Sequence, residues 1–250
     1  MTNLTPVNKQ AHLKTRIDVN QVEKQAAELH MVPVVMSEFR KLMVHYPIVV
    51  SKHAETGQFM CSALLGLDSD ENLFFENGQW QGIYIPLQVT RQPFFLGNNA
   101  PQGTPEDYVM CIDAAHPAVG NDGEPLFDEH GEPSSYLQSQ QNNLAQLLQG
   151  EQETQQLLQQ LLQLDLLTSI RLDIELADGS PHHVNGLYSI DEDKLALVSA
   201  EQLKQLQESS ALSAIYCLMH STGQIYSLID KKNKRIATGE AWFKKASGDD

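Results

Sequence analysis

Apolar and polar residues alternate with the period of β-strands in the first half of the chain. Residues 48–51 and 58–65 are apolar runs separated by a turn at Gly57, which predicts a hairpin. Residues 108–113 form a further run of strand type, and residues 97–106, rich in Asn, Gly and Pro, read as a loop. This half of the chain therefore predicts antiparallel β-structure.

A second hairpin is predicted inside an aromatic stretch that covers residues 72–97. The segments 73–76 and 79–85 flank Asn77-Gly78, a dipeptide that tolerates the positive φ angles of a type I′ turn. Two prolines, Pro86 and Pro93, limit regular pairing beyond the hairpin because proline lacks a backbone N–H.

Helical periodicity replaces the strand pattern after residue 134. A stripe of leucines recurs at spacings of three and four residues, which predicts that one face of the helix is buried. The stripe consists of Leu144, Leu147, Leu148, Leu157, Leu158, Leu161 and Leu162. Gly150 is expected to divide this region into two helices because glycine is a poor helix former. Earlier in the chain, a short helix over residues 37–46 is predicted, with Ser37 as its N-cap.

Strict alternation over residues 169–176 predicts a third hairpin, with a turn at Asp178-Gly179 and a returning strand over residues 182–190. A helix is expected over residues 199–208, where Ser199 and Gln202 fit a capping box. Two apolar segments follow, 211–220 and 224–229, and are read as C-terminal helices.

These elements predict an α+β fold with antiparallel hairpins in the N-terminal half, Leu/Gln-rich helices after residue 134, then a hairpin and C-terminal helices. The pattern divides the chain into four parts. They are an N-terminal segment (1–30), a β-rich part (31–133), a helical part with one hairpin that continues the same domain (134–230), and a basic mobile tail (231–250).

Charge is unevenly distributed along this acidic chain of net charge −15. Residues 54–230 carry −21, whereas each flanking segment carries +3. Such a negative body repels phosphate backbones, so nucleic acid is not expected as a partner. The longest apolar runs are far too short to span a bilayer, so no membrane span is expected.

Three cysteines, Cys61, Cys111 and Cys217, lie far apart in apolar surroundings. An odd number of scattered cysteines favours buried free thiols in a reducing compartment over a disulfide framework. The N-terminus lacks the apolar core of a signal peptide, so a cytoplasmic location is expected, with export by a route that needs no such signal left open.

The aromatic stretch supplies the candidate binding residues, which are Phe74, Trp80, Tyr84, Arg91 and Phe94. Arg91 is the one Lys or Arg between Lys52 and Arg171, and its planar guanidinium can bind a carboxylate or stack on an aromatic ring. An internal ion pair with Glu71 or Glu76 is the alternative.

Consecutive aromatic residues add a geometric argument. The two rings of Phe74-Phe75 must point to opposite faces of a strand, so one face should carry exposed or partner-covered rings.

Other residue types do not form a catalytic or metal motif. Successive strand residues such as His182 and His183 point to opposite faces and cannot share one metal ion without distortion. Cys217 and His220 lie three apart on a predicted helix, where a thiolate–imidazole pair competes with a buried structural thiol. Asp128 and Glu129 are read as a solvated turn rather than a cation site. No cofactor, metal or catalytic residue is therefore assigned.

The order of short motifs along the chain resembles the bacterial SapC family. The motifs are YPIVV (46–50), ALLGL (63–67), NLFFENGQW (72–80), YIP (84–86), RQPF (91–94), GEPLFDEHGEP (123–133), NGLYSIDEDKL (185–195) and AIYCLMHS (214–221). One departure concerns residues 90–94, where the family usually has two adjacent cations before Tyr-Pro-Phe and this chain has Thr90-Arg91-Gln92-Pro93-Phe94. This departure speaks against an anion site that needs both cations.

The resemblance implies an accessory role without established catalytic residues. Family members are associated with surface layers, carry peptide-transport labels, and occur beside flavin-dependent halogenase-like and cupin-like genes. We therefore expect a non-enzymatic protein that holds a peptide or protein partner on an aromatic hairpin face around Trp80 and Arg91. Two alternatives stay open: a metal-dependent enzyme acting on a peptide or protein, and a self-associating surface-layer subunit.

Overall fold

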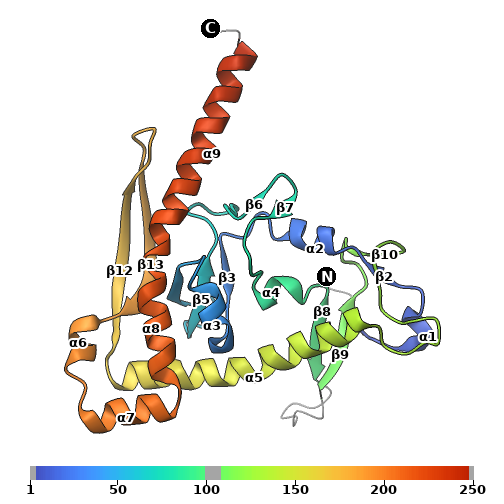
Figure 1. Ribbon diagram of the computed structural model, residues 1–250, viewed down its shortest axis with the longest axis horizontal. Helices are drawn as coiled ribbons and strands as arrows, with labels where there is room; N and C mark the ends of the chain where they lie inside the picture. The colour runs from blue at the N-terminus through green and yellow to red at the C-terminus, as the bar shows by residue number, and fades with distance from the viewer. Residues whose placement is uncertain (1–3, 99–107, 248–250) are drawn as a thin grey trace. The chain divides into compact units, whose positions relative to one another are not determined.

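The computed structural model describes residues 4–98 and 108–247 and has the α+β composition that the sequence predicts (Figure 1). Most of the loop predicted at 97–106 lies outside the described residues, as do the last three residues of the chain. The chain divides into two compact units, each built from separated segments. Unit 1 comprises Met1–Ala27, Phe75–Gln81 and Ile85–Gly150, and unit 2 comprises Glu28–Phe74, Gly82–Tyr84 and Glu151–Asp250.

Unit 1 contains short strands arranged in small antiparallel sheets. One sheet has the order β1-β9-β8, another the order β10-β2-β11, and β6 pairs with β7. The strands are β1 (Leu4–Pro6), β2 (Arg16–Ile17), β6 (Phe75–Glu76), β7 (Gln79–Trp80), β8 (Phe94–Asn98), β9 (Tyr108–Asp113), β10 (Val119–Gly120) and β11 (Glu124–Pro125). The short helices are α1 (Lys9–His12), α2 (Val19–Gln25) and α4 (Leu87–Thr90).

The hairpin predicted at Asn77-Gly78 is confirmed, with φ angles of 52° and 80° at the two turn residues. It is shorter than predicted, because pairing stops at Trp80. The core of unit 1 packs apolar side chains from its sheets against the first part of α5 (Ser135–Gln163). Its buried members are Ile17, Val22, Phe94, Ile112, Ala118, Leu126, Leu137 and Leu144.

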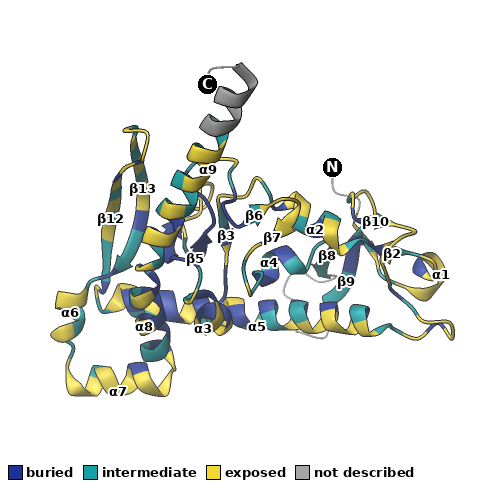
Figure 2. Cartoon of the chain, turned by 45° about the horizontal axis from the view of Figure 1, so that its top comes forward, coloured by how far each residue is buried: buried dark blue, intermediate teal, exposed yellow. Residues whose placement is uncertain are grey.

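Unit 2 is built on a five-stranded antiparallel sheet of order β12-β13-β4-β5-β3. Its strands are β3 (Met31–Pro33), β4 (Ile48–Lys52), β5 (Phe59–Leu64), β12 (Leu167–Glu175) and β13 (Pro181–Ile190). The hairpins predicted around Gly57 and Asp178-Gly179 are both confirmed as β4–β5 and β12–β13. Exposed and partly buried residues alternate along β12 and β13, as the sequence pattern predicts (Figure 2).

The helices of unit 2 include the predicted capping box. Ser199 accepts a hydrogen bond from the N–H of Gln202, and the Gln202 side chain accepts one from the N–H of Ser199, at the start of α7. The helical elements are η1 (Met36–Glu38), α3 (Phe39–Leu42), α6 (Glu192–Ala196), α7 (Ala200–Glu208), α8 (Ala211–Ser221) and α9 (Gln224–Ser247).

Two helix predictions were wrong in detail. Ser37 does not cap the helix predicted over residues 37–46, because a 3-10 turn over Met36–Glu38 precedes α3. The side chain of Glu38 satisfies the N–H of Val35 instead. Gly150 does not break α5, which runs without interruption from Ser135 to Gln163. A single glycine costs only about 1 kcal/mol in a helix, which the burial of the leucine stripe outweighs.

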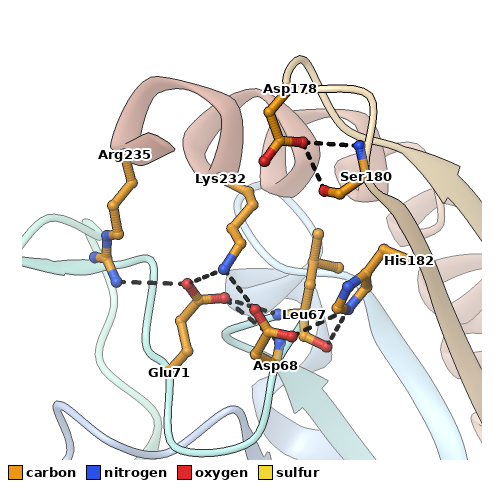
Figure 3. Close-up of polar contacts among 8 residues, drawn as sticks. All are labelled: Leu67, Asp68, Glu71, Asp178, Ser180, His182, Lys232 and Arg235. Carbon is orange, nitrogen blue, oxygen red and sulfur yellow. Dashed lines mark hydrogen bonds and ion pairs between the residues drawn. The ribbon is translucent and has the colours of Figure 1, made fainter. Parts of the chain in front are cut away.

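The C-terminal segment also differs from the mobile tail expected over residues 231–250. Residues 231–247 form the second part of α9. Figure 3 shows the ammonium of Lys232 between the carboxylates of Asp68 and Glu71. Its Nζ lies 2.5 Å from Asp68 Oδ2 and 2.7 Å from Glu71 Oε1. Because Lys232 and Glu71 are only 14% and 10% exposed, this pair is sheltered from water and holds α9 against the loop after β5.

Arg235 and His182 also contact the same loop. Arg235 donates from Nη2 to the carbonyl of Asn72 at 2.9 Å. On the other side of the ion pair, Nε2 of His182 in β13 lies 2.8 Å from the carbonyl of Leu67 and 3.5 Å from Asp68 Oδ1 (Figure 3). The loop is therefore held by both α9 and the sheet.

We expect Lys232→Met to lower the free energy of unfolding by about 3 kcal/mol, because it leaves the carboxylate of Glu71, whose side chain is only 10% exposed, without its main counterion. Lys234→Met is the matched control on the same helix, because the Lys234–Asp230 pair is exposed and should contribute less than about 0.5 kcal/mol. Urea unfolding followed by circular dichroism measures both. Equal effects of the two substitutions would contradict the assignment.

The same ion pair predicts a dependence on alkaline pH. Burial acts to lower the pKa of Lys232, but the hydrogen bonds and charges of Asp68 and Glu71 outweigh it and raise the pKa above 10.5. A raised pKa contributes stability that is complete below the unfolded value and is lost as the pH rises through the folded value. The difference in stability between the wild type and Lys232→Met should stay constant to about pH 10 and shrink above it. A difference that shrinks toward acidic pH alone would contradict this.

Candidate functional site

The five residues predicted to form one binding face belong to two different units. Phe74 and Tyr84 are part of unit 2, whereas Trp80, Arg91 and Phe94 are part of unit 1. Each group is therefore considered by itself.

The pair in unit 2 serves as internal structure. Phe74 is 2% exposed, and its ring packs on Tyr46 with the ring centroids 4.5 Å apart. The hydroxyl of Tyr46 donates to the carbonyl of Tyr84 at 2.7 Å, and the hydroxyl of Tyr84 donates to Oε1 of the buried Glu38 at 3.1 Å. Burial, together with the negative charge of Glu38, raises the pKa of Tyr84. Phe74 is therefore a core side chain, and Tyr84 is half-buried with its hydroxyl bonded to Glu38.

Two of the predicted residues in unit 1 are also buried. Phe94 is fully buried in the core and faces the ring of Tyr136, while Trp80 is 9% exposed and its backbone N–H donates to Glu23 Oε2. Phe74, Trp80 and Phe94, which the sequence analysis named as candidate binding residues, are therefore buried side chains. Burying a large aromatic ring is worth about 2–3 kcal/mol, so the core takes these side chains first.

Arg91 is placed by a compact sequence of local elements. Pro86 is the N-cap of α4, and Arg91 is its C-cap, donating its backbone N–H to the carbonyl of Leu87 at 2.9 Å. The peptide bond between Gln92 and Pro93 is cis, and β8 begins at the next residue. The N–H of Phe94 then donates to the carbonyl of Arg91 at 2.7 Å, which closes the turn.

The guanidinium of Arg91 is held in one orientation by three contacts. Its Nε donates to Oε1 of Gln88 at 2.6 Å, and its Nη1 donates to the carbonyl of Phe94 at 2.7 Å. Its Cζ lies 4.4 Å from the centroid of the Phe95 ring, which is a cation–π stacking distance. The stacking alternative raised by the sequence is therefore the one that the structure contains.

The internal ion pair that the sequence left open as an alternative for Arg91 is absent from the described part of the chain. No carboxylate in residues 4–98 or 108–247 lies within ion-pair distance of the Arg91 guanidinium. Of the two acids considered, Glu71 belongs to unit 2 and binds Lys232. Burial lowers the pKa of Arg91, because a desolvated cation without a nearby acid loses hydration.

The chemistry that this arrangement offers is recognition of an anion. A guanidinium has five N–H donors, and two of those of Arg91 are used within the described chain, by Gln88 and Phe94. The remaining donors at the Nη1–Nη2 end form the fork that matches a carboxylate. Arg91 as a whole is half-buried.

The other residues considered from the sequence do not converge. His182 contacts Leu67 and His183 contacts Asp173, on opposite faces of β13 as expected. The described residues contain no group of three or more His, Cys, Asp or Glu side chains placed to hold a metal ion. Asp68, Glu71 and His182 are ligand types, but the ammonium of Lys232 lies against both carboxylates.

The thiol and turn candidates also have structural roles. Cys217 is buried and burial raises its pKa, while the exposed His220 stacks on Tyr216, so the two do not form a reactive pair. All three cysteines are buried free thiols. Asp128 accepts backbone N–H bonds from His130 and Glu132 within its own turn. No helix in the described residues has the length and apolar character that crossing a bilayer requires.

Sequence reasoning missed two residues of the Arg91 site, Gln88 and Phe95. Gln88 lies three residues before Arg91 in a helical turn, a spacing at which side chains meet. Phe95 is the second member of a Phe-Phe pair, and the alternation argument had already required one ring of each such pair to face outward. Both signals were present in the sequence.

Of three comparisons with known proteins, one found a match. No curated protein and no solved structure matches the chain. A family model described as SapC matches residues 7–228 of the 250 residues, which is most of the chain. The ordered motifs and this match agree, and the chain belongs to the SapC family.

Proposed function

We propose that this protein is a binding or accessory protein that holds a peptide or protein partner, with Arg91 as the anchor for a carboxylate of that partner. The observation that carries the proposal is the oriented, half-buried guanidinium of Arg91, which has no acidic partner among the described residues. A desolvated cation gains more from a carboxylate than an exposed one does.

Preorganisation supports a binding role. Gln88, the carbonyl of Phe94 and the ring of Phe95 fix the guanidinium before any ligand arrives. A ligand that binds it therefore does not need to order a flexible side chain, which would otherwise cost about 0.5–1.5 kcal/mol. Arginine stays protonated in proteins and acts neither as a general base nor as a nucleophile at neutral pH, so this geometry is suited to holding and orienting.

The charge of the chain restricts the partner further. Residues 54–230 carry −21, so a strongly acidic partner is repelled at long range. A single carboxylate next to neutral or basic residues avoids this repulsion. The C-terminal carboxylate of a peptide and an isolated Asp or Glu side chain share this chemistry.

We place this role in the cytoplasm, because the buried free cysteines suit a reducing compartment. The family resemblance makes flavin-dependent halogenase-like and cupin-like proteins reasonable partners to test.

The expected result is that carboxylate-bearing peptides bind the wild type and lose about 10- to 100-fold in affinity with Arg91→Gln, as expected for one charged hydrogen-bonded pair. The probe is a set of short synthetic peptides of mixed sequence, each made with a free C-terminal carboxylate and as the C-terminal amide. Fluorescence anisotropy measures binding. Peptides with an internal Asp or Glu and an amidated C-terminus distinguish a side-chain carboxylate from a terminal one.

Two variants serve as comparisons. Arg91→Lys keeps the charge but loses the fork and the ring stacking, so it should recover only part of the affinity. Arg16→Gln removes the same charge from an exposed position of the same unit and should leave binding unchanged. Equal affinity for carboxylate and amide peptides throughout the set, or equal binding by wild type and a folded Arg91→Gln, would refute the proposal.

A further inference from the structure

The five-stranded sheet of unit 2 has β12 as one of its two edge strands. This strand is the last in the sheet order, is nine residues long, and contains neither proline nor glycine. Within the described residues, β13 is the only strand that pairs with it. Alternate backbone N–H and C=O groups of β12 therefore point away from the sheet, where another strand can pair with them.

The opposite edge of the same sheet is closed to such pairing. β3 has only three residues and includes Pro33, which lacks the N–H that a ladder needs. The difference between the two edges shows that β12 is not guarded by shortness or by proline.

The outer charges of β12 are arranged symmetrically around Leu172. Arg171 and Asp173 flank it and are 62% and 56% exposed at their side chains. When two β12 strands run antiparallel with Leu172 opposite Leu172, Arg171 of each strand lies opposite Asp173 of the other. In the same register Ile170 lies opposite Ile174, so both faces of the strand match their counterpart.

We propose that two copies of this chain associate by antiparallel pairing of their β12 strands, with the two-fold axis at Leu172. The contact joins two five-stranded sheets into one continuous ten-stranded sheet. It contains two Arg171–Asp173 pairs between the copies and a central apolar contact. This inference rests on unit 2 and is independent of the Arg91 site in unit 1.

Charge selects this register over its neighbours. A slip of one residue would turn every side chain to the wrong face. A slip of two residues places Arg171 opposite Arg171 or Asp173 opposite Asp173, depending on its direction. Like charges directly opposite one another destabilise a strand pair. The register centred on Asp173 also brings Arg171 opposite Glu175, so the register centred on Leu172 is the one of the three that pairs opposite charges without a like-charge contact.

Irregularity in the hairpin lies on β13 and not on β12. Ile170 pairs with Leu187 and Leu172 with Val184, so the extra residue belongs to β13. Gly186, with φ of 80°, allows that bulge. β12 consequently keeps a regular outer edge for a second strand.

A groove beside β12 gives the contact a second source of stability. The groove has a volume of about 390 Å³. Its lining combines the apolar side chains of Leu172, Ile174, Ile225, Tyr226 and Ile229 with Arg171, Asp173 and Thr222. Tyr226 is 78% exposed. Because the groove adjoins the strand edge, pairing of two copies shields apolar side chains there from water.

Dimerisation replaces ion pairs within one chain by ion pairs between the two copies, at little cost in free energy. In the single chain, Asp173 accepts from Arg171 Nε at 2.8 Å and lies 2.6 Å from His183 Nδ1, all at exposed positions. Exposed ion pairs contribute little net stability, so exchanging a contact within the strand for one between copies is nearly neutral in itself. The gain comes from backbone pairing and apolar burial, and the charges set the register. Because the contact is closed by a two-fold axis, it gives a dimer and not an open polymer.

Sedimentation velocity of the full chain from about 1 µM to about 1 mM, a range that covers weak and strong interfaces, tests the proposal. The wild type should form a dimer. Arg171→Asp and Asp173→Arg should each weaken dimerisation at least about tenfold, because each places like charges opposite one another. An equimolar mixture of the two variants should recover the dimer, since every facing pair is again of opposite sign.

Controls separate the interface from folding and from register. Circular dichroism melting verifies that each variant is folded, and recovery in the mixture cannot arise from contacts within one chain. Glu175→Gln should leave the dimer unchanged, because Glu175 faces Ser169 in this register, whereas in the register centred on Asp173 it would face Arg171. A wild type that stays monomeric throughout, or a mixture of folded variants that stays monomeric, overturns the proposal.

Discussion

Burial of the first four residues of β4 is the constraint on which unit 2 depends. Ile48, Val49 and Val50 are at most 1% exposed, and the strand is paired on both sides, with β5 and β13. The backbone of Ile48 is satisfied even at the end of the strand, where its N–H donates to Ser221 Oγ at 2.9 Å. A strand buried on both faces and both edges must lie in the interior of the sheet, so the sheet extends from β4 in both directions and ends in two edges.

The two edge strands, β3 and β12, differ in length and in proline content, and the start of α9 lies close to β12. The groove at β12 includes residues from the start of α9, and Lys232 further along α9 is fixed by Asp68 and Glu71. The sheltered ion pair thus positions the helix whose first turns line the groove. Removing water from the Lys232 ammonium is costly, and the carboxylates of Asp68 and Glu71 compensate for that cost.

Much of the fold could be predicted from local patterns, because turn chemistry and alternation are local. The Asn77-Gly78 and Asp178-Gly179 hairpins, the strand at residues 108–113 and the Ser199 capping box all depend on a few neighbouring residues. The continuity of α5 through Gly150 could not be predicted in this way, because it depends on burial along the whole helix. The pairing of Lys232 with residues more than 160 positions away is likewise invisible to local patterns.

In the candidate site, too, local patterns predict some features and long-range packing decides the others. Alternation correctly required one ring of Phe74-Phe75 and one of Phe94-Phe95 to face outward, but it could not say which. In the structure Phe74 and Phe94 are buried, whereas Phe75 and Phe95 are half-exposed. Only the three-dimensional packing assigns Phe95 to Arg91.

Charges on an edge strand usually prevent association, and their sign pattern decides whether they do so on β12. Charges of one sign repel a second copy in every register. β12 carries Arg171 and Asp173 two positions apart, so the repulsion depends on register and vanishes when the strands are centred on Leu172. Glu175 adds a negative charge that faces Ser169 in that arrangement and meets no like charge. The charges on this edge therefore favour the register centred on Leu172, in which opposite charges face each other and no like charges meet.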